Sequence, residues 1–186
     1  MSSIVGIPDI GEGMLVAFMP RLMNRDGFYH NGKRMHIERQ NEQNKYLPDW
    51  GLFIDYELIG VIDPETKGAA VNYIFDNPAC NISVPRWTWK YHMGKTTRRN
   101  ETNKIKAYRE MAGGSFWIGM KDTYKMAFAI HARDILSSEI RDVERGNFAR
   151  SLTIFDVPRN RCRICEIATT DLEEFIIEKL EKENLI

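Results

Sequence analysis

Hydrophobic and polar residues alternate along several stretches of the chain, and this alternation is the pattern of half-buried β-strands. Between residues 52 and 62, apolar side chains fall on one face of an extended segment and acidic side chains on the other. A second alternating run covers residues 69–75, after the turn-forming sequence at 63–68. Together these features predict a β-hairpin with a long loop.

The alternation continues in the second half of the chain. Residues 82–93 are the next predicted strand, and Pro85 favours an edge position because proline donates no hydrogen bond to a neighbouring strand. Residues 116–131 predict one long strand or a hairpin that folds near Lys121 and Asp122. Two shorter strands are predicted at 152–157 and 162–169.

The clearest helical pattern lies at the end of the sequence. Thr170 followed by Glu173 is a capping-box sequence, in which each side chain bonds the backbone N–H of the other residue. An apolar stripe at helical spacing follows: Leu172, Phe175, Ile176 and Leu180. Residues 133–145 carry a weaker pattern, which predicts a short helix.

Length and composition place these elements in one fold. A chain of 186 residues with 43% hydrophobic and 28% charged residues is typical of a globular domain that buries a substantial core. We expect a single domain over residues 1–186 of the α+β class, with a twisted antiparallel sheet, a C-terminal helix and a few short helices. Residues 24–50 and 94–114 are polar and low in periodicity, which predicts mobile loops.

A basic excess is concentrated in one part of a chain whose total formal charge is zero. Residues 86–109 contain eight Lys or Arg and one acid, Glu101, a local net charge of +7. In an extended segment Trp87, Trp89 and Tyr91 share one face, where aromatic side chains more often pack in a core than stack on bases. The side chains expected to contact phosphate, lipid or nucleic acid are Lys95, Arg98, Arg99, Lys104, Lys106 and Arg109. A solvated basic loop without a partner is the alternative.

Motifs that would indicate catalysis or metal binding are incomplete. Gly94-Lys95-Thr96 is the end of a phosphate-binding loop, but Trp89 stands where that motif requires its first glycine. Cys162 and Cys165 have the spacing of half a zinc site or of a redox pair, and no second pair completes it. In a strand, residues three apart also point to opposite faces. The sequence therefore predicts no catalytic residue, no metal and no cofactor.

One stretch of the sequence resembles a known family. The run His92-Met93-Gly94-Lys95-Thr96 and the strand that follows from Phe116 to Ile130 are similar to the central part of rhabdovirus matrix proteins. In that family an MGK run precedes an F-x-IG-x-x-K strand and a long alternating strand. The chain lacks the family's Pro-Pro-x-Tyr motif and its lysine-rich N-terminus.

The resemblance implies a non-enzymatic structural protein of a virion. Such a protein would associate with itself, with the viral nucleocapsid or RNA, and with an anionic membrane surface. Its expected location is the virion and the host cytoplasm, peripheral to membrane. The self-association surface is expected in the apolar run 14–19, and core packing is the alternative for the same residues: Met14, Leu15, Val16 and Phe18.

Two other functions stay open on the sequence. The first is a small nucleic-acid-binding accessory protein, such as a silencing suppressor or a movement-type factor, whose binding would depend on salt and on Arg98 and Arg99. The second is an enzyme of unrecognised type, which would need a concave site with perturbed titratable groups.

Overall fold

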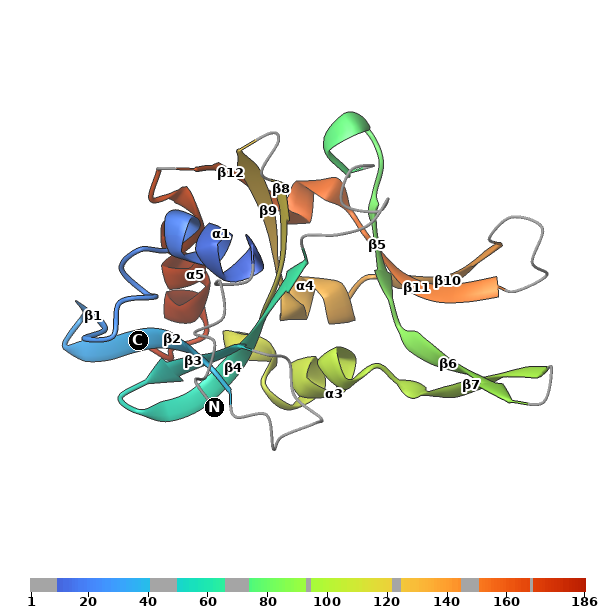
Figure 1. Ribbon diagram of the computed structural model, residues 1–186, viewed down its shortest axis with the longest axis horizontal. Helices are drawn as coiled ribbons and strands as arrows, with labels where there is room; N and C mark the ends of the chain where they lie inside the picture. Colours follow the sequence, from blue (N-terminus) through green and yellow to red (C-terminus); the bar gives the residue numbers. More distant parts are fainter. Residues whose placement is uncertain are drawn as a thin grey trace, which may run out of the picture.

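Seven strands form one mixed sheet that organises the rest of the molecule (Figure 1). The structure, a computed structural model, describes residues 10–40, 50–65, 74–92, 95–121, 125–144, 151–167 and 169–186. Neighbouring strands along this sheet are, in order, β1 (Phe28–His30), β2 (Lys33–Arg39), β3 (Trp50–Ile54), β4 (Glu57–Glu65), β8 (Phe116–Lys121), β9 (Met126–His131) and β12 (Arg163–Glu166).

One pair of neighbours in this sheet runs parallel, whereas the others run antiparallel. The parallel pair is β4 and β8, and its register places Asp63 opposite Trp117. Parallel strands need a crossover connection. Here the connection includes helix α3 (Asn103–Glu110), which packs against β4.

A tight turn divides a segment that alternation alone predicts as one strand. β3 ends at Ile54 and β4 begins at Glu57, so the chain reverses at Asp55 and Tyr56. Both residues have positive φ, 47° and 68°, as the central residues of a two-residue hairpin do. The prediction of one strand at 52–62 was wrong because such turns are usually marked by glycine at the second position, and tyrosine carries no such signal.

Other predicted strands are present with small changes. The run 116–131 is the hairpin of β8 and β9. The predicted strand 82–93 is divided at Arg86 into β5 (Ile82–Pro85) and β6 (Trp87–His92). The shorter strands are β11 (Ser151–Val157) and β12, with the 3₁₀ turn Arg159–Arg161 between them. The predicted strand 69–75 is not formed where it is described, since residues 74–76 are helical.

Helices α1 (Ile10–Phe18) and α5 (Asp171–Lys182) cover one face of the sheet (Figure 1). The apolar stripe of α5 is buried there, as its spacing predicts. The predicted capping box is absent, however: Glu173 is fully buried and accepts hydrogen bonds from the backbone N–H groups of Arg21 and Leu22, at 3.1 and 2.9 Å. The side chain of Glu173 therefore joins α5 to the segment after α1.

Helices α3 and α4 (Ala132–Leu136) lie on the opposite face, over a second apolar core. Its strand residues are offset by one position from those of the first core, so Val61 and Trp117 point to this side and Ile62 and Phe116 to the other. At Gly60, strand β4 runs directly against the 3₁₀ turn Ala112–Gly114. A Cβ on Gly60 would lie 1.8 Å from the carbonyl oxygen of Gly114, so only glycine fits.

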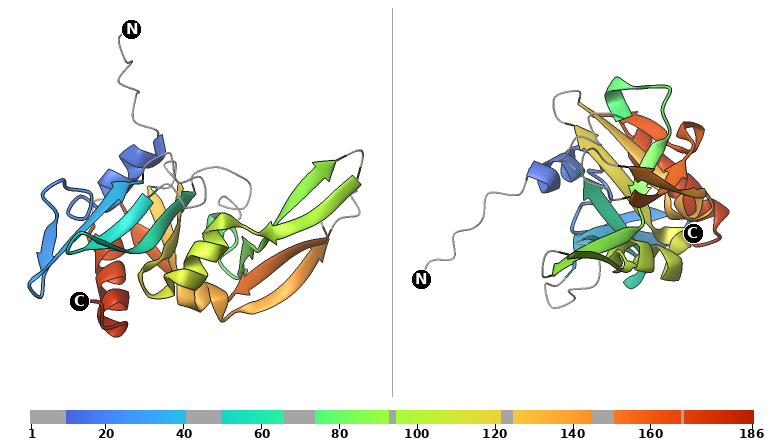
Figure 2. Two further views of the ribbon diagram at one scale, coloured as in Figure 1. Left: turned by 90° about the horizontal axis from the view of Figure 1, so that it is seen from below. Right: turned by 90° about the vertical axis from the view of Figure 1, so that its right-hand side faces the viewer.

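Two smaller groups of strands extend from the body on the side of α3 and α4, which we call the fork. One is the sheet β10 (Glu139–Glu144), β11 and β5, and the other is the hairpin of β6 and β7 (Lys95–Glu101). Figures 1 and 2 show that both point in the same direction away from the seven-stranded sheet. The predicted helix 133–145 is in fact the short helix α4 followed by β10.

The fold is α+β and forms a single domain, with a curled sheet rich in antiparallel pairs, a C-terminal helix and several short helices. The sequence prediction of the fold class is confirmed. The segments predicted as mobile loops contain regular elements: β1 and β2 lie in 24–50, and β7 and α3 lie in 94–114.

Candidate functional site

An ion pair lies at the end of the parallel strand pair, between Asp63 of β4 and Lys104 of α3. The Nζ of Lys104 is 2.9 Å from Oδ2 of Asp63, and the two side chains are 20% and 23% exposed. The contact does not have the alignment of a hydrogen bond, and Oδ2 is itself buried. Asp63 is near the carboxyl end of β4 and lies opposite Trp117, the second residue of β8. The pair is thus held by the fold and still reached by solvent.

Two buried polar groups beside this pair have no hydrogen-bond partner among the residues that the structure describes. They are the hydroxyl of Tyr108 and the indole Nε1 of Trp117. The Lys104 ammonium lies 5.3 Å from the centre of the Trp117 ring. Burial raises the pKa of Tyr108 well above its ordinary value, and the negative charge of Asp63 adds to this rise. The Tyr108 hydroxyl therefore stays protonated and remains a donor within the electrostatic reach of Asp63.

Unpartnered buried donors are unusual, because leaving one without a partner costs about 1–3 kcal/mol. Two of them, from Tyr108 and Trp117, lie next to one partly exposed carboxylate–ammonium pair, and the described residues contain two more such donors elsewhere, Arg21 Nη2 and Gln40 Nε2. Chemically, the arrangement offers a carboxylate that accepts protons, a cation that attracts anions, and neutral donors behind them. It could bind an anionic group and move a proton at its edge.

The basic segment lies next to this site but is partly neutralised. Glu101 accepts hydrogen bonds from Arg109 at 2.8 Å and from Arg86 at 3.1 Å. The bond from Arg109 lowers the pKa of the Glu101 carboxyl, and the bond from Arg86 lowers it further against the opposing effect of burial. The lone acid of the segment thus holds two of its cations in place.

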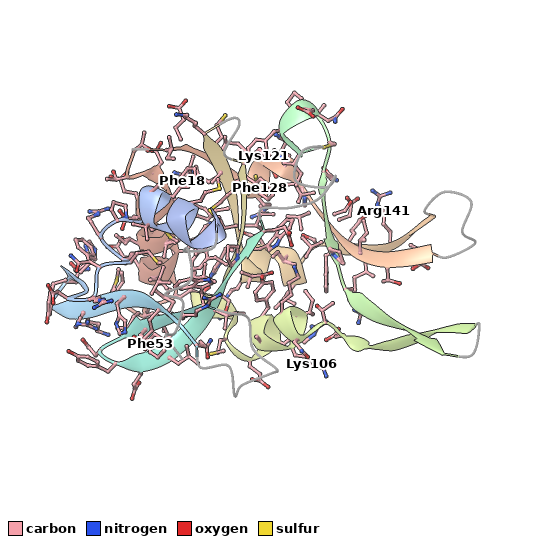
Figure 3. The ribbon with its side chains drawn as sticks, in the orientation of Figure 1. Phe18, Phe53, Lys106, Lys121, Phe128 and Arg141 are labelled. Carbon is pink, nitrogen blue, oxygen red and sulfur yellow. The ribbon has the colours of Figure 1, made fainter. Side chains whose placement is uncertain are left out.

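The six basic residues predicted to contact an anionic partner lie in different environments in the structure. Lys104 and Arg109 are in ion pairs, and Lys106 is exposed on α3, at the lower edge of the molecule in Figure 3. The backbone of Lys95, Arg98 and Arg99 is part of strand β7, while their side chains lie outside the described residues, as do those of Trp87, Trp89 and Tyr91. Residues 95–110 thus form strand β7 and helix α3 rather than a loop, and Thr102 caps α3 by accepting a hydrogen bond from the N–H of Ile105.

The apolar run predicted for self-association is mostly inside the protein. Met14, Leu15 and Phe18 are buried in the first core, and Figure 3 shows Phe18 within the body. Val16 is 46% exposed. Helical spacing, with Leu15 and Phe18 on the inner side of α1 and Val16 on its outer side, explains the difference. The run therefore does not form a continuous apolar surface on the described protein.

The two cysteines three residues apart belong to different cores. Cys165 is buried in the first core, while Cys162 packs against the second. Burial raises the pKa of Cys162 to about 11 and that of Cys165 to about 12, so both remain thiols at neutral pH. Within the described residues, no group of three His, Cys, Asp or Glu side chains is placed to hold a metal ion.

The Asp63–Lys104 pair leaves little sign in the sequence. There, Asp63 is the first residue of a turn-forming run, and Lys104 is one of six cations in a polar stretch. One feature of the sequence does point to Asp63: it is an acidic residue directly after the apolar run of a buried strand. The strand places its carboxylate inside the fold. Its partner cannot be found from spacing, since 41 positions separate the two residues in the sequence.

Comparison with known proteins gives one structural match. No protein-family model and no curated protein matches the chain. Among solved structures, the fold is similar to one described as a nuclease from a fusselovirus, with a TM-score of 0.42 and 15% sequence identity. The match covers 81% of this chain and 77% of that chain.

This comparison corrects the prediction of a non-enzymatic, matrix-like protein, because the structure that it finds is described as a nuclease. The assignments as a matrix protein, a structural protein and a non-enzyme are withdrawn together. The resemblance of residues 92–131 to rhabdovirus matrix proteins stays a prediction, as do the expected partners and the location in virion and cytoplasm. In the part of the chain that the structure describes, no helix has the length and apolar character needed to span a membrane.

Proposed function

We propose that this chain is an enzyme of the nuclease type, which hydrolyses a phosphodiester bond of nucleic acid at Asp63 and Lys104. The observation that carries the proposal is the partly exposed Asp63–Lys104 pair between β4 and α3. Next to it lie the buried donors of Tyr108 and Trp117, which have no hydrogen-bond partner among the described residues.

The chemistry of the pair suits this reaction. In hydrolysis, the oxygen of a water molecule bonds to phosphorus while the bond from phosphorus to a sugar oxygen breaks. Asp63 would take the proton of the attacking water, and the leaving sugar oxygen would take a proton from solvent. The Lys104 ammonium would stabilise the negative charge that builds up on the phosphate oxygens in the transition state.

Nucleic acid is the favoured substrate because of the charges around the pair. Lys104 and the exposed Lys106 share helix α3, and strand β7, which is part of the segment with net charge +7, ends three residues before Lys104. A polyanion gains affinity from several such contacts at once. Another carboxylate of β4, that of Glu65, lies two residues beyond Asp63 on the same side of the strand.

The test is cleavage of a supercoiled plasmid and of fluorescent single- and double-stranded oligonucleotides, in buffers with Mg²⁺, with Mn²⁺ and with EDTA. Asp63→Asn and Lys104→Met are each expected to lower the cleavage rate by about 100-fold or more, as the loss of a proton acceptor or of a charge-stabilising group does. Neither variant should unfold the protein, because both side chains are partly exposed.

Matched controls come from ion pairs elsewhere in the molecule. Asp156→Asn breaks the pair with Arg141 on the fork, and Lys182→Met breaks the pair with Glu178 on α5. Both variants should cleave at the wild-type rate. The proposal fails if the wild-type chain binds nucleic acid without cleaving it under any of these conditions, or if Asp63→Asn remains fully active.

A further inference from the structure

The turn between β3 and β4 carries an exposed tyrosine in a strained backbone conformation. Tyr56 has a φ of 68° and is 74% exposed. In a two-residue hairpin this position favours glycine, because a side chain there meets the backbone. Strain of this kind persists where surrounding contacts hold it, and it gathers at binding sites. The side chain of Tyr56 is not packed in a core, so core packing does not account for it.

The ring of Tyr56 is supported on one side by a fixed guanidinium. The Cζ of Arg34 lies 4.6 Å from the ring centre. The Arg34 side chain is buried and donates to the carbonyl oxygens of Asp26 at 3.2 Å and Arg25 at 2.9 Å. Gly27, with a φ of 76°, makes room for it: a Cβ there would be 2.8 Å from Nε of Arg34. The other side of the Tyr56 ring faces solvent.

Aromatic side chains continue from Tyr56 across the sheet, and the first of them, His36, is buried. The ring of His36 stacks on Phe53 at 4.9 Å with an angle of 14° between the planes, and it lies 6.1 Å from the ring of Tyr56. Phe53 is half-buried. We call these four residues, Arg34, His36, Phe53 and Tyr56, the aromatic platform.

The aromatic platform and the Asp63–Lys104 pair lie on the same face of the sheet. Phe53 is opposite Leu58 in the register, and both have the orientation that Val61 and Asp63 have farther along β4, on the side away from the first core. The separation from Tyr56 to Asp63 is about 20 Å along the strand. In Figure 3, Phe53 and Lys106 are both in the lower part of the molecule.

We infer that the aromatic platform binds an unpaired nucleobase of single-stranded nucleic acid by stacking on Tyr56. The inference rests on the proposed function for the kind of ligand. A base stacks on an exposed aromatic ring regardless of sequence, and an arginine plane behind the ring adds a cation–π contact. A base within a duplex has no free face to offer. The substrate bound here is therefore a single strand or a frayed end.

The experiment measures binding separately from cleavage. The Asp63→Asn variant in EDTA is titrated with fluorescein-labelled oligo-dT and with an abasic oligonucleotide of the same length and charge, and fluorescence anisotropy reports the affinity. We expect oligo-dT to bind more tightly than the abasic strand, and Tyr56→Gly to weaken oligo-dT binding by about tenfold while leaving abasic binding unchanged.

Two variants distinguish the loss of stacking from a loss of folding. Tyr56→Phe keeps the ring and should bind oligo-dT as the parent does. Tyr56→Gly relieves the strain of the turn and should raise the melting temperature, so a loss of binding cannot come from unfolding. Equal affinity for the abasic strand and oligo-dT, or unchanged oligo-dT binding by Tyr56→Gly, overturns the inference.

These outcomes are separable from those of the nuclease test. If the wild-type chain cleaves nothing but binds oligo-dT through Tyr56, the aromatic platform stands and the proposed enzyme does not. If cleavage depends on Asp63 while binding ignores Tyr56, the enzyme stands and the platform does not.

Discussion

Acidic side chains on the two faces of the seven-stranded sheet have contrasting environments, and the contrast separates structural from chemical use of a carboxylate. On the side of α1 and α5, Glu173 is fully buried and accepts three hydrogen bonds, two from backbone N–H groups and one from Arg21 Nε. On the side of α3, Asp63 has one ion contact and stands among donors without partners in the described residues. A fully bonded carboxylate fixes the position of segments, whereas a partly bonded one retains capacity for a ligand.

The largest expected difference between the two faces is in stability. Glu173→Gln replaces one of the two buried acceptor oxygens with an NH2 donor, which leaves either Arg21 Nε or the two backbone N–H groups without an acceptor, and it should lower the free energy of unfolding by about 3 kcal/mol. Asp63→Asn breaks a partly exposed pair and should change it by no more than about 1 kcal/mol. Urea unfolding followed by circular dichroism measures both. If Asp63→Asn destabilises as much as Glu173→Gln does, Asp63 is a structural residue and the contrast is lost.

A smaller difference is expected in the response to pH. Burial lowers the pKa of His131 below 6.5, against the opposing effects of the Gly113 carbonyl and of the Glu183 and Asp134 carboxylates. Burial also lowers the pKa of His36, with help from Arg34. A histidine kept neutral in the fold contributes stability above its unfolded pKa, and this contribution is lost as pH falls below about 6.5.

Stability should therefore decrease between about pH 7 and 5, and His131→Gln should make this decrease shallower. His36→Gln should have a weaker effect of the same sign, because the nearby Glu38 opposes the lowering of the His36 pKa. Urea unfolding across this pH range tests both variants. A slope that neither variant changes would mean that other groups dominate the acid response.

The smallest expected effect concerns the thiols of Cys162 and Cys165, one of which packs in each of the two cores. With pKa values of about 11 and about 12, Cys162 and Cys165 should react with iodoacetamide near pH 8 far more slowly in the folded protein than in urea. Mass spectrometry of alkylated peptides measures each rate. Fast labelling of Cys165 in the folded state would show that β12 opens and that the first core is less closed at its edge than its burial indicates.

The spacing of apolar residues and the secondary-structure propensity of each segment predicted much of the fold from the sequence. The alternation at 116–131 and the apolar stripe of α5 were found because each element shows its own buried face locally. The turn at Asp55 and Tyr56 was missed because its residues depart from the usual turn sequence, and the strand β7 and helix α3 were missed because charged residues dominate them. Departures from local rules are expected where a protein keeps residues for function.

The site itself depends on long-range geometry. Lys104 carries the charge that the sequence showed, but only the crossover from β4 to β8 brings it to Asp63. The partners of Glu173 are likewise about 150 positions away in the sequence. Spacing rules describe neighbours within one element, so neither contact could be predicted without the topology.

The place of the fork in the chain has a mechanical consequence. β5, β6 and β7 occur between the strand that carries Asp63 and the helix that carries Lys104. Only Thr102 and Asn103 separate the end of β7 from Lys104, and Glu101 clamps this junction to Arg86 and Arg109. Because Lys104 follows so closely, we expect a tilt of the β6–β7 hairpin to move its ammonium group. A partner bound to the hairpin should therefore change the distance between the Asp63 carboxylate and the Lys104 ammonium.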